Sequence, residues 1–336
     1  MEAVTAIKPG SMVDSFGRTI SYVRISVTDR CNLRCRYCMA EHMQFLPRRD
    51  LLTLEEIVDL ADIFVARGVR RLRLTGGEPL VRRGIGGLFE SLGRRIGEGL
   101  EEVTLTTNGV LLDRFADLLA GNGVRRVNVS LDSLSPDRFA HITRGGDVSQ
   151  VMAGIAAARA AGLKVKINMV ALAGLNDDEF EDMLLWCDSQ GLDLTLIETM
   201  PLGEVEEDRT CHYLPLDAVR QRLEQRFGLI PTLTRTGGPA RYYEIAGMTA
   251  RLGMITPLSA NFCAGCNRIR VAATGTVYGC LGHDQKVELR DALRSGGAGA
   301  VGELLDTLLA GKPKRHDFHI AAAEPAVARH MSVTGG

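Results

Sequence analysis

Two groups of three cysteines, one near each end of this 336-residue chain, are the residues best suited to chemistry. The first group is Cys31, Cys35 and Cys38 in CNLRCRYC, and the second is Cys263, Cys266 and Cys280 in CAGCNRIRVAATGTVYGC. A [4Fe–4S] cluster usually takes one cysteine for each of its four irons, so either group would leave one iron open to a small molecule. An open coordination position is typical of catalytic metal sites, whereas structural sites are closed.

Zinc is the alternative for both groups, because short Cys-x2-Cys spacings are also typical of zinc sites. His42 or His283 would then supply a fourth ligand. The first group favours a cluster, since Cys-x3-Cys-x2-Cys with Tyr37 before the last cysteine is not a usual zinc-finger spacing. The second group, taken alone, favours neither. Cys187, in an apolar helical stretch, and Cys211, in a polar loop, are interpreted as bystanders.

Composition limits the classes of partner. Forty Lys and Arg against 41 Asp and Glu leave a net charge of −1, which argues against general nucleic-acid or membrane binding. The start MEAVTAIKPG has no long apolar segment of a secretory signal, and no run is long enough to span a bilayer. We therefore expect a cytoplasmic protein with reduced thiols. The length fits one large domain with an appended lobe, or two domains.

Between Tyr22 and Met200, β-like runs alternate with helical patterns, which predicts successive βα units and a parallel sheet. The expected strands are 22–28, 69–77, 101–109, 125–133, 163–172 and 192–200. The first helix should begin with a capping box of Thr53 and Glu56 and end before Gly68, and four more are expected at 88–96, 112–121, 149–162 and 178–191. The sequence thus predicts an α/β fold, a partial (β/α)6 TIM-like barrel with its chemistry at the carboxyl ends of the strands.

After Pro201 this alternation stops. We expect a helix at 216–228, β-hairpins at 240–256 and 268–281 that contain the second cysteine group, two short helices and a polar tail. The predicted organisation is an N-terminal extension at 1–20, the barrel at 21–200, a C-terminal region at 201–325 and a tail at 326–336.

The segment LTGGEPL follows the second expected strand, where glycines allow a ligand to approach the backbone and Glu78 adds a carboxylate. CNLRCRYC followed one βα unit later by GGEP resembles the radical S-adenosylmethionine enzymes. The resemblance implies a [4Fe–4S] cluster on the first cysteine group, with S-adenosylmethionine on its open iron. It also implies S-adenosylmethionine contacts at Tyr37, Gly76, Gly77, Glu78, Ser130 and Met200.

A narrower resemblance extends over nearly the whole chain. FCAGCNRIR with GTVYGCL, together with LRLTGGEPLVRR, NVSLDSL, GPARYYEIAG and a terminal MSVTGG, resembles the GTP 3′,8-cyclase family of molybdenum cofactor biosynthesis. It implies a second [4Fe–4S] cluster, whose free iron binds the guanine of GTP. The GTP contacts that it implies are Arg24, Arg73, Thr106, Lys166, Arg268 and Arg270, to which we add Arg71 from the strand face of Arg73.

These cations make physical sense for such a substrate, since a triphosphate needs Arg and Lys around its oxygens. Arg24, Arg71, Arg73 and Lys166 interrupt otherwise apolar strands, where an unpaired cation is costly and a bound anion would stabilise it. Edge-strand snorkelling or internal salt bridges are the alternative. One position departs from the family pattern: Thr195 stands where an arginine is usual, which removes one charge directed at phosphate.

The resemblance implies the reaction as well. A 5′-deoxyadenosyl radical made from S-adenosylmethionine removes the C3′ hydrogen of GTP, and the ring closes onto C8 to give 3′,8-cyclo-7,8-dihydro-GTP. The terminal Gly335 and Gly336 would reach into the active site, because residues without side chains can thread a crowded channel. The implied partners are an external electron donor and cyclic pyranopterin monophosphate synthase, which takes the product; a homodimer is compatible with the sequence.

Two rival functions are kept open. One is a different radical S-adenosylmethionine enzyme with an auxiliary cluster, such as a peptide-modifying maturase, which would share CNLRCRYC and GGEP but not CNRIR or the diglycine end. The other is a zinc-stabilised binding or scaffold protein. The two differ from the favoured function in substrate and in metal, respectively.

Overall fold

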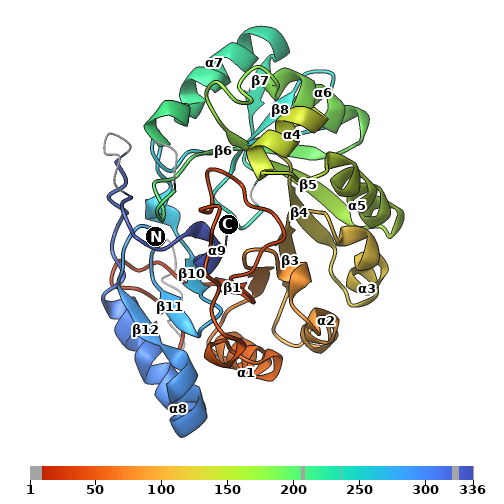
Figure 1. Cartoon of the computed structure of the whole chain (residues 1–336). Helices are drawn as coiled ribbons and strands as arrows, with labels where there is room; N and C mark the ends of the chain where they lie inside the picture. The colour runs from red at the N-terminus through yellow and green to blue at the C-terminus, as the bar shows by residue number, and fades with distance from the viewer. Residues whose placement is uncertain (1–9, 206–208, 235, 320–324, 336) are drawn as a thin grey trace.

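A curved sheet forms the frame of the protein in the computed structural model, which describes residues 10–205, 209–234, 236–319 and 325–335 (Figure 1). Six parallel strands follow one another across the sheet in chain order. They are β1 (Tyr22–Ser26), β2 (Arg71–Thr75), β3 (Glu102–Thr107), β4 (Arg126–Ser130), β5 (Lys164–Ala171) and β6 (Asp193–Glu198). Each lies within a strand expected from the sequence, and the α/β partial-barrel prediction is confirmed.

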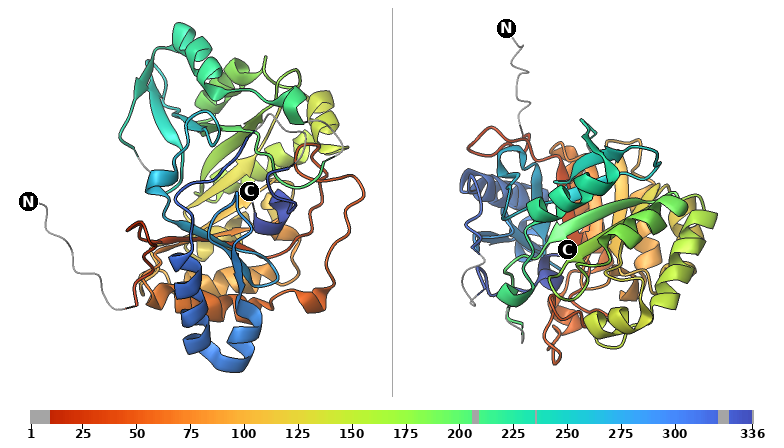
Figure 2. Two further views of the ribbon diagram at one scale, coloured as in Figure 1. Left: turned by 90° about the vertical axis from the view of Figure 1, so that its left-hand side faces the viewer. Right: turned by 90° about the horizontal axis from the view of Figure 1, so that it is seen from above.

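Helices cover the outer face of this arc, as Figures 1 and 2 show. They are α1 (Leu54–Ala66), α2 (Ile85–Gly93), α3 (Ala116–Gly121), α4 (Pro136–Thr143), α5 (Val148–Ala160) and α6 (Phe180–Ser189). The capping box of Thr53 and Glu56 is present at the start of α1. Helix α4 was not expected; Ser135 caps its start and Pro136 occupies its first turn.

The C-terminal hairpins extend the same sheet at both edges. Strand β9 (Leu252–Ile255) pairs in parallel with β6, and β10 (Arg268–Val271) pairs in parallel with β1. The expected hairpins are completed by antiparallel partners, β8 (Arg241–Ile245) and β11 (Thr276–Tyr278). The outermost strands are β7 (Leu229–Pro231) and β12 (Lys286–Glu288), so the sheet has twelve strands within the described ranges and runs past the boundary predicted at residue 200.

The remaining helices are α7 (Leu216–Phe227), α8 (Leu289–Ala310) and α9 (Met331–Thr334). Non-helical dihedral angles at Gly297 divide α8, in keeping with the two short helices expected there. The short α9 lies inside the arc of strands, near its centre in Figure 1. Within the described part of the chain, no helix is long and apolar enough to cross a bilayer.

Candidate active site

The two cysteine groups lie at opposite ends of two neighbouring parallel strands. Cys31 follows Ser26, the last residue of β1, whereas Cys266 precedes Arg268, the first residue of β10. Because β1 and β10 are parallel, with Tyr22 opposite Arg268, the first group is at the carboxyl end of the barrel and the second at the amino end. The expectation that the chemistry of the six barrel strands gathers at their carboxyl ends covers the first group alone, since the strand that follows the second group joins the sheet outside the βα alternation.

The carboxyl-end cavity, as we call the first of two cavities, contains the first cysteine group. The predicted site residues in its wall are Cys31, Cys35, Cys38, Tyr37, Gly76, Gly77, Thr106, Ser130 and Met200. Other residues in the wall include Thr75, Asn168, Met331 and Ser332. Its only charged lining side chain among the described residues is Glu198, and no Lys or Arg contributes to its wall.

The first cysteine group fits an iron–sulfur cluster. The thiols are free and half-buried, and the Leu33 amide and the Asn108 side chain donate to the sulfur of Cys31 at 3.4 and 3.8 Å. Burial first, and then Asp132 and the two neighbouring thiols, raises the pKa of Cys35 well above its usual value. Cys31 and Cys35, two thiols that resist ionisation alone, would be stabilised as thiolates by iron.

A mononuclear zinc site gains no support at either end. In the described ranges, no three His, Cys, Asp or Glu side chains are gathered closely enough to hold one metal ion. A four-iron cluster does not need its cysteines to meet at a single metal ion, because each cysteine binds a different iron.

The GGEP segment packs against the loop that leads to Cys31. A Cβ on Gly76 would lie 2.5 Å from the Thr28 carbonyl oxygen, and a Cβ on Gly77 would lie 2.4 Å from that of Arg30. The Gly77 amide donates to the Thr28 carbonyl at 2.9 Å. Both glycines line the cavity. This close backbone contact is by itself enough to require glycine at both positions, whether or not a ligand is bound.

Glu78 is fully buried and does not line the carboxyl-end cavity. Its carboxylate accepts hydrogen bonds from the amides of Leu80 and Asn108, at 3.0 and 2.7 Å, and from the Thr107 hydroxyl at 2.8 Å. Burial nevertheless raises the pKa of Glu78 to about 7. The carboxylate therefore joins the loops after β2 and β3, and its predicted contact with S-adenosylmethionine stays a prediction.

Tyr37 reaches across the same cavity from the cysteine loop. Its hydroxyl donates to the Asp132 carboxylate at 2.7 Å, and the Val170 amide donates to the other carboxylate oxygen at 2.9 Å. Burial raises the pKa of Asp132 to about 6. The carboxyl end of the barrel thus has buried acidic groups close behind its wall.

The second cavity, the amino-end cavity, has the opposite character. Its wall includes five cations, and the described residues that line it include no carboxylate. The cations are Arg24, Arg73, Lys166, Arg268 and Arg270, and Cys263, Cys266 and Cys280 lie in the same wall. Five of the seven predicted GTP contacts are thereby brought together; Thr106 instead lines the carboxyl-end cavity and accepts a 3.0 Å hydrogen bond from Arg73.

Arg71 is the predicted GTP contact that the structure places elsewhere. It is the first residue of β2, its side chain is 36% exposed, and it donates to Glu101 at 3.1 Å and lies 3.9 Å from Glu102. It lines neither cavity. The alternation of strand side chains placed it on the face of Arg73, but it lies too close to the amino end of the strand and is paired with carboxylates.

Three arginines form a row across the sheet. Arg24 stands opposite Arg270 on β10 and opposite Arg73 on β2. Burial first, and then Arg73 and Arg268, lowers the pKa of Arg24 to about 10, and its buried Nε has no hydrogen-bond partner among the described residues. Adjacent cations that are buried or half-buried without carboxylates are costly, and a bound anion would stabilise the row.

The second cysteine group lies beside a buried lysine. Lys312 is 2% exposed, and its ammonium donates to the Gly279 carbonyl at 2.6 Å and to the Cys266 sulfur at 3.7 Å. Burial would raise the pKa of Cys266, but Arg268 and Lys312 outweigh it and lower this pKa to about 7. A thiol that ionises readily beside two others suits a cluster ligand.

The C-terminal tail enters the barrel between the two cavities. Met331 lines both of them, Ser332 lines the carboxyl-end cavity, and Arg270 donates to the carbonyls of Thr334 and Gly335. Gly335 is buried, with φ +74°, and a Cβ there would lie 1.8 Å from the Thr75 hydroxyl oxygen. Only glycine fits this position. Gly336 lies outside the described residues.

Sequence reasoning missed several residues of these cavities. Met331 lines both, whereas Lys312 and Tyr242 lie directly behind the wall of the amino-end cavity. Asn168, which also lines both cavities, is a polar residue that the sequence does mark near the carboxyl end of its strand. Nothing in the sequence marks Lys312, which is buried only because the chain after α8 folds back onto the second cysteine group.

Comparisons with known proteins agree with this geometry. Residues 25–187 match the family described as the radical SAM superfamily, and residues 192–318 match Molybdenum Cofactor Synthesis C. The crystal structure of Streptococcus suis SuiB bound to S-adenosylmethionine has a TM-score of 0.60 over 93% of this chain and 77% of that chain. At 15% sequence identity, this likeness shows the fold alone.

Curated relatives are far more similar. The GTP 3′,8-cyclase of Erythrobacter litoralis is 57% identical over 97% of this chain and 98% of its own length. Those of Rhizobium meliloti and Caulobacter vibrioides are 58% and 56% identical, each over 97% of this chain and 94% of their own lengths. The resemblance stated from the sequence is thereby confirmed, and the chain belongs to the GTP 3′,8-cyclase family of radical S-adenosylmethionine enzymes.

Proposed function

We propose that this protein converts GTP to 3′,8-cyclo-7,8-dihydro-GTP, the first step of molybdenum cofactor biosynthesis. The observation that carries the proposal is the pairing of two cavities in one barrel, each with three cysteines; among the residues that the structure describes, no Lys or Arg lines the first and five line the second. S-adenosylmethionine carries a cationic sulfonium and ammonium, whereas GTP carries about four negative charges. Charge complementarity assigns the first to the carboxyl-end cavity and the second to the amino-end cavity.

Both cysteine groups fit [4Fe–4S] clusters. Cys31, Cys35 and Cys38 would hold the first, and Cys263, Cys266 and Cys280 the second. The first cluster, when bound, supplies the electron that cleaves S-adenosylmethionine to methionine and a 5′-deoxyadenosyl radical. The second leaves one iron without a cysteine, open to the guanine of GTP.

The residues of the chain position the two ligands. Arg24, Arg73, Lys166, Arg268 and Arg270 would bind the phosphates and orient the nucleotide, while Tyr37, Ser130 and Met200 would enclose S-adenosylmethionine. Asn168, Ile197, Met200 and Met331 line both cavities and so mark their junction. The C3′ hydrogen of GTP must face the deoxyadenosyl carbon there, because hydrogen transfer needs near contact.

The reaction also sets its partners. Reductive cleavage needs an external one-electron donor, and the cyclic product should pass to cyclic pyranopterin monophosphate synthase. A homodimer is not needed for the chemistry as we describe it, because both cavities lie within one chain.

An oxygen-free assay with GTP deuterated at C3′ tests the proposal. Reconstituted protein, S-adenosylmethionine and dithionite should give 5′-deoxyadenosine that carries one deuterium, together with the cyclised nucleotide. Mass spectrometry measures both. Undeuterated 5′-deoxyadenosine, formed without a cyclised product, would contradict the assignment of GTP as substrate.

A further inference from the structure

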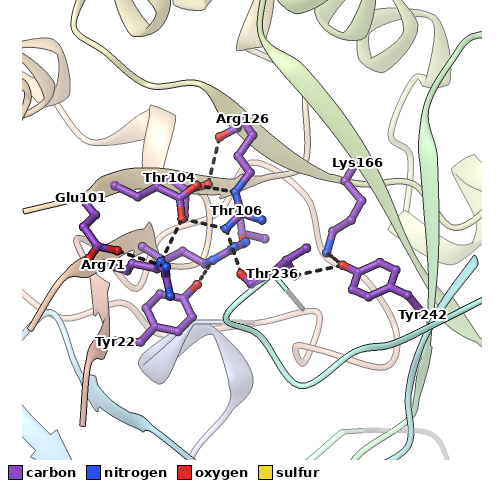
Figure 3. A network of polar contacts seen from close by, with 11 residues as sticks. Tyr22, Arg71, Glu101, Thr104, Thr106, Arg126, Lys166, Thr236 and Tyr242 are labelled. Carbon is purple, nitrogen blue, oxygen red and sulfur yellow. Dashed lines mark hydrogen bonds and ion pairs between the residues drawn. The ribbon is translucent and has the colours of Figure 1, made fainter. Parts of the chain in front are cut away.

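Tyr242 on β8 belongs to the wall of the barrel but not to the surface of the amino-end cavity. Its side chain is 2% exposed, and its hydroxyl lies behind two residues that do line the cavity, Lys166 and Thr236. The Lys166 ammonium donates to this hydroxyl at 3.1 Å, and the hydroxyl lies 3.1 Å from the Thr236 hydroxyl (Figure 3).

The lysine fixes the direction of the first of these two hydrogen bonds. A charged ammonium can only donate, so the Tyr242 oxygen accepts from Lys166, and the Tyr242 hydroxyl has its own proton to donate to Thr236. The Thr236 oxygen accepts that proton and keeps its own O–H free to donate. Two of the three ammonium hydrogens of Lys166 also remain. Lys166 and Thr236, the two of these side chains that line the cavity, therefore each have at least one hydrogen to donate into it.

The backbone of Thr236 is held from the other side. Its carbonyl accepts a 3.1 Å hydrogen bond from Arg126, which is also paired with Glu102 through two hydrogen bonds, one of 2.7 Å. The hydroxyl of Thr236 is thus fixed between Tyr242 and the start of β4, as Figure 3 shows. A donor fixed in this way before the ligand arrives needs little ordering on binding.

The space for the Tyr242 ring depends on two small neighbours. Gly253 stands opposite both Thr195 and Tyr242 in the sheet. A Cβ on Gly253 would lie 2.8 Å from the Thr195 hydroxyl oxygen and 3.1 Å from the Tyr242 ring. Thr195 and the Tyr242 ring thus both pack against the space above Gly253, which has no room for a side chain there.

We propose that Lys166 and Thr236 form a two-donor subsite for the phosphate groups of the substrate, and that Tyr242 is the positioning residue that organises it. The inference rests on the proposed function, in which the anion of the amino-end cavity is GTP. Lys166 is in the set of contacts already expected, whereas Thr236 and Tyr242 are new. A phosphate group suits the subsite because it offers several acceptor oxygens and no donor when ionised.

Tyr242→Phe tests the positioning role, because it keeps the ring and removes only the hydroxyl. Tyr243→Phe, the next residue along β8 and half-buried, is the matched control. Equilibrium binding of GTP and of guanosine, measured without oxygen on reconstituted protein with S-adenosylmethionine, is the readout. We expect Tyr242→Phe and Thr236→Val each to weaken GTP binding about tenfold, to leave guanosine binding unchanged, and to raise KM for GTP with little change in kcat.

Three outcomes are informative. Wild-type affinity for GTP in Tyr242→Phe, or equal weakening of GTP and guanosine, would overturn the subsite. Intact reductive cleavage of S-adenosylmethionine in each variant shows that the fold and the first cluster survive. If the wild-type protein itself binds no GTP, the proposed function fails, and that result is distinct from a failure of the subsite.

Discussion

The two ends of the barrel hold similar cysteine groups in opposite electrostatic surroundings. At the carboxyl end, burial and Asp132 raise the pKa of Cys35, and no cation lines the cavity in the part of the chain that the structure describes. At the amino end, Arg268 and Lys312 outweigh burial and lower the pKa of Cys266 to about 7. The difference teaches that similar cysteine groups can stand in opposite electrostatic surroundings, and it suits the proposed placement of a cationic cosubstrate at one end and a polyanion at the other.

Changes in the C-terminal tail should have the largest effect, because the tail lies between the two ends of the barrel. Gly335→Ala places a Cβ against Thr75 at a positive φ, so the tail must leave its position. We expect cyclisation to fall by about a hundredfold or more, as it should on deletion of Gly335 and Gly336. Both changes should spare the iron content and the formation of 5′-deoxyadenosine. If the truncated protein still makes the cyclic nucleotide, the tail has no role in the active site.

The arginine row sharpens the amino-end half of the comparison. Arg24→Met removes a buried cation flanked by Arg73 and Arg270, so GTP should bind about 30- to 100-fold more weakly, while S-adenosylmethionine binding is unchanged. The melting temperature should hold or rise, because the repulsion within the row is relieved. Arg71→Met, which removes an exposed ion pair, is the control and should change GTP affinity little. Calorimetry measures the GTP affinity of both variants. Equal losses of affinity would contradict the placement of Arg71 outside the GTP site.

A change at Glu78 tests the carboxyl end of the barrel, and of the substitutions compared it should have the smallest effect on ligand binding. Glu78→Gln removes a buried acid near the cavity, and we expect S-adenosylmethionine to bind a few-fold more weakly above pH 7, with GTP binding unaffected. Glu90→Gln, on the exposed side of α2, is the control. If Glu78 has no electrostatic part in binding, the two variants will have the same affinity.

Glu78 also gives a pH dependence of stability. Its pKa is raised to about 7 in the folded protein, so the folded state holds the proton more tightly than the unfolded state. The corresponding stability is present below the unfolded pKa, near 4.5, and is lost as the pH rises through about 7. Chemical denaturation at pH 5 and pH 8 should show this loss in the wild type and a smaller one in Glu78→Gln.

Much of this arrangement is readable from the sequence, and the part that is not has a physical reason. The six strands of the barrel and all of its helices except α4 follow from local periodicity, and the capping box of α1 follows from four consecutive residues. Strands β9 and β10 were found as hairpins, but their parallel pairing with β6 and β1 is a long-range contact that no local pattern records. The position of the second cysteine group at the amino end of the barrel could not be predicted for that reason.

The site residues divide in the same way. The motifs located the cysteines, the glycines of GGEP and the cations of the amino-end cavity. The resemblance implied Arg73 and not Arg71; strand alternation added Arg71, because both residues share a face and only depth along the strand distinguishes them. Lys312 and Tyr242 act through partners distant in sequence, namely Cys266 and Lys166, so they carry no local signal.

The most direct test of the account is the affinity of each ligand as a function of pH, measured separately on reconstituted protein without oxygen. Burial first, and then Arg73 and Arg126, lowers the pKa of Lys166 to about 7. GTP affinity should therefore fall as the pH rises above 7, by up to about tenfold per unit. S-adenosylmethionine affinity should rise between pH 5.5 and 7.5, as Asp132 and Glu78, with pKa values of about 6 and 7, become charged. Affinities that move in the same direction, or that stay flat, would contradict the assignment of the two ligands to oppositely charged ends of the barrel.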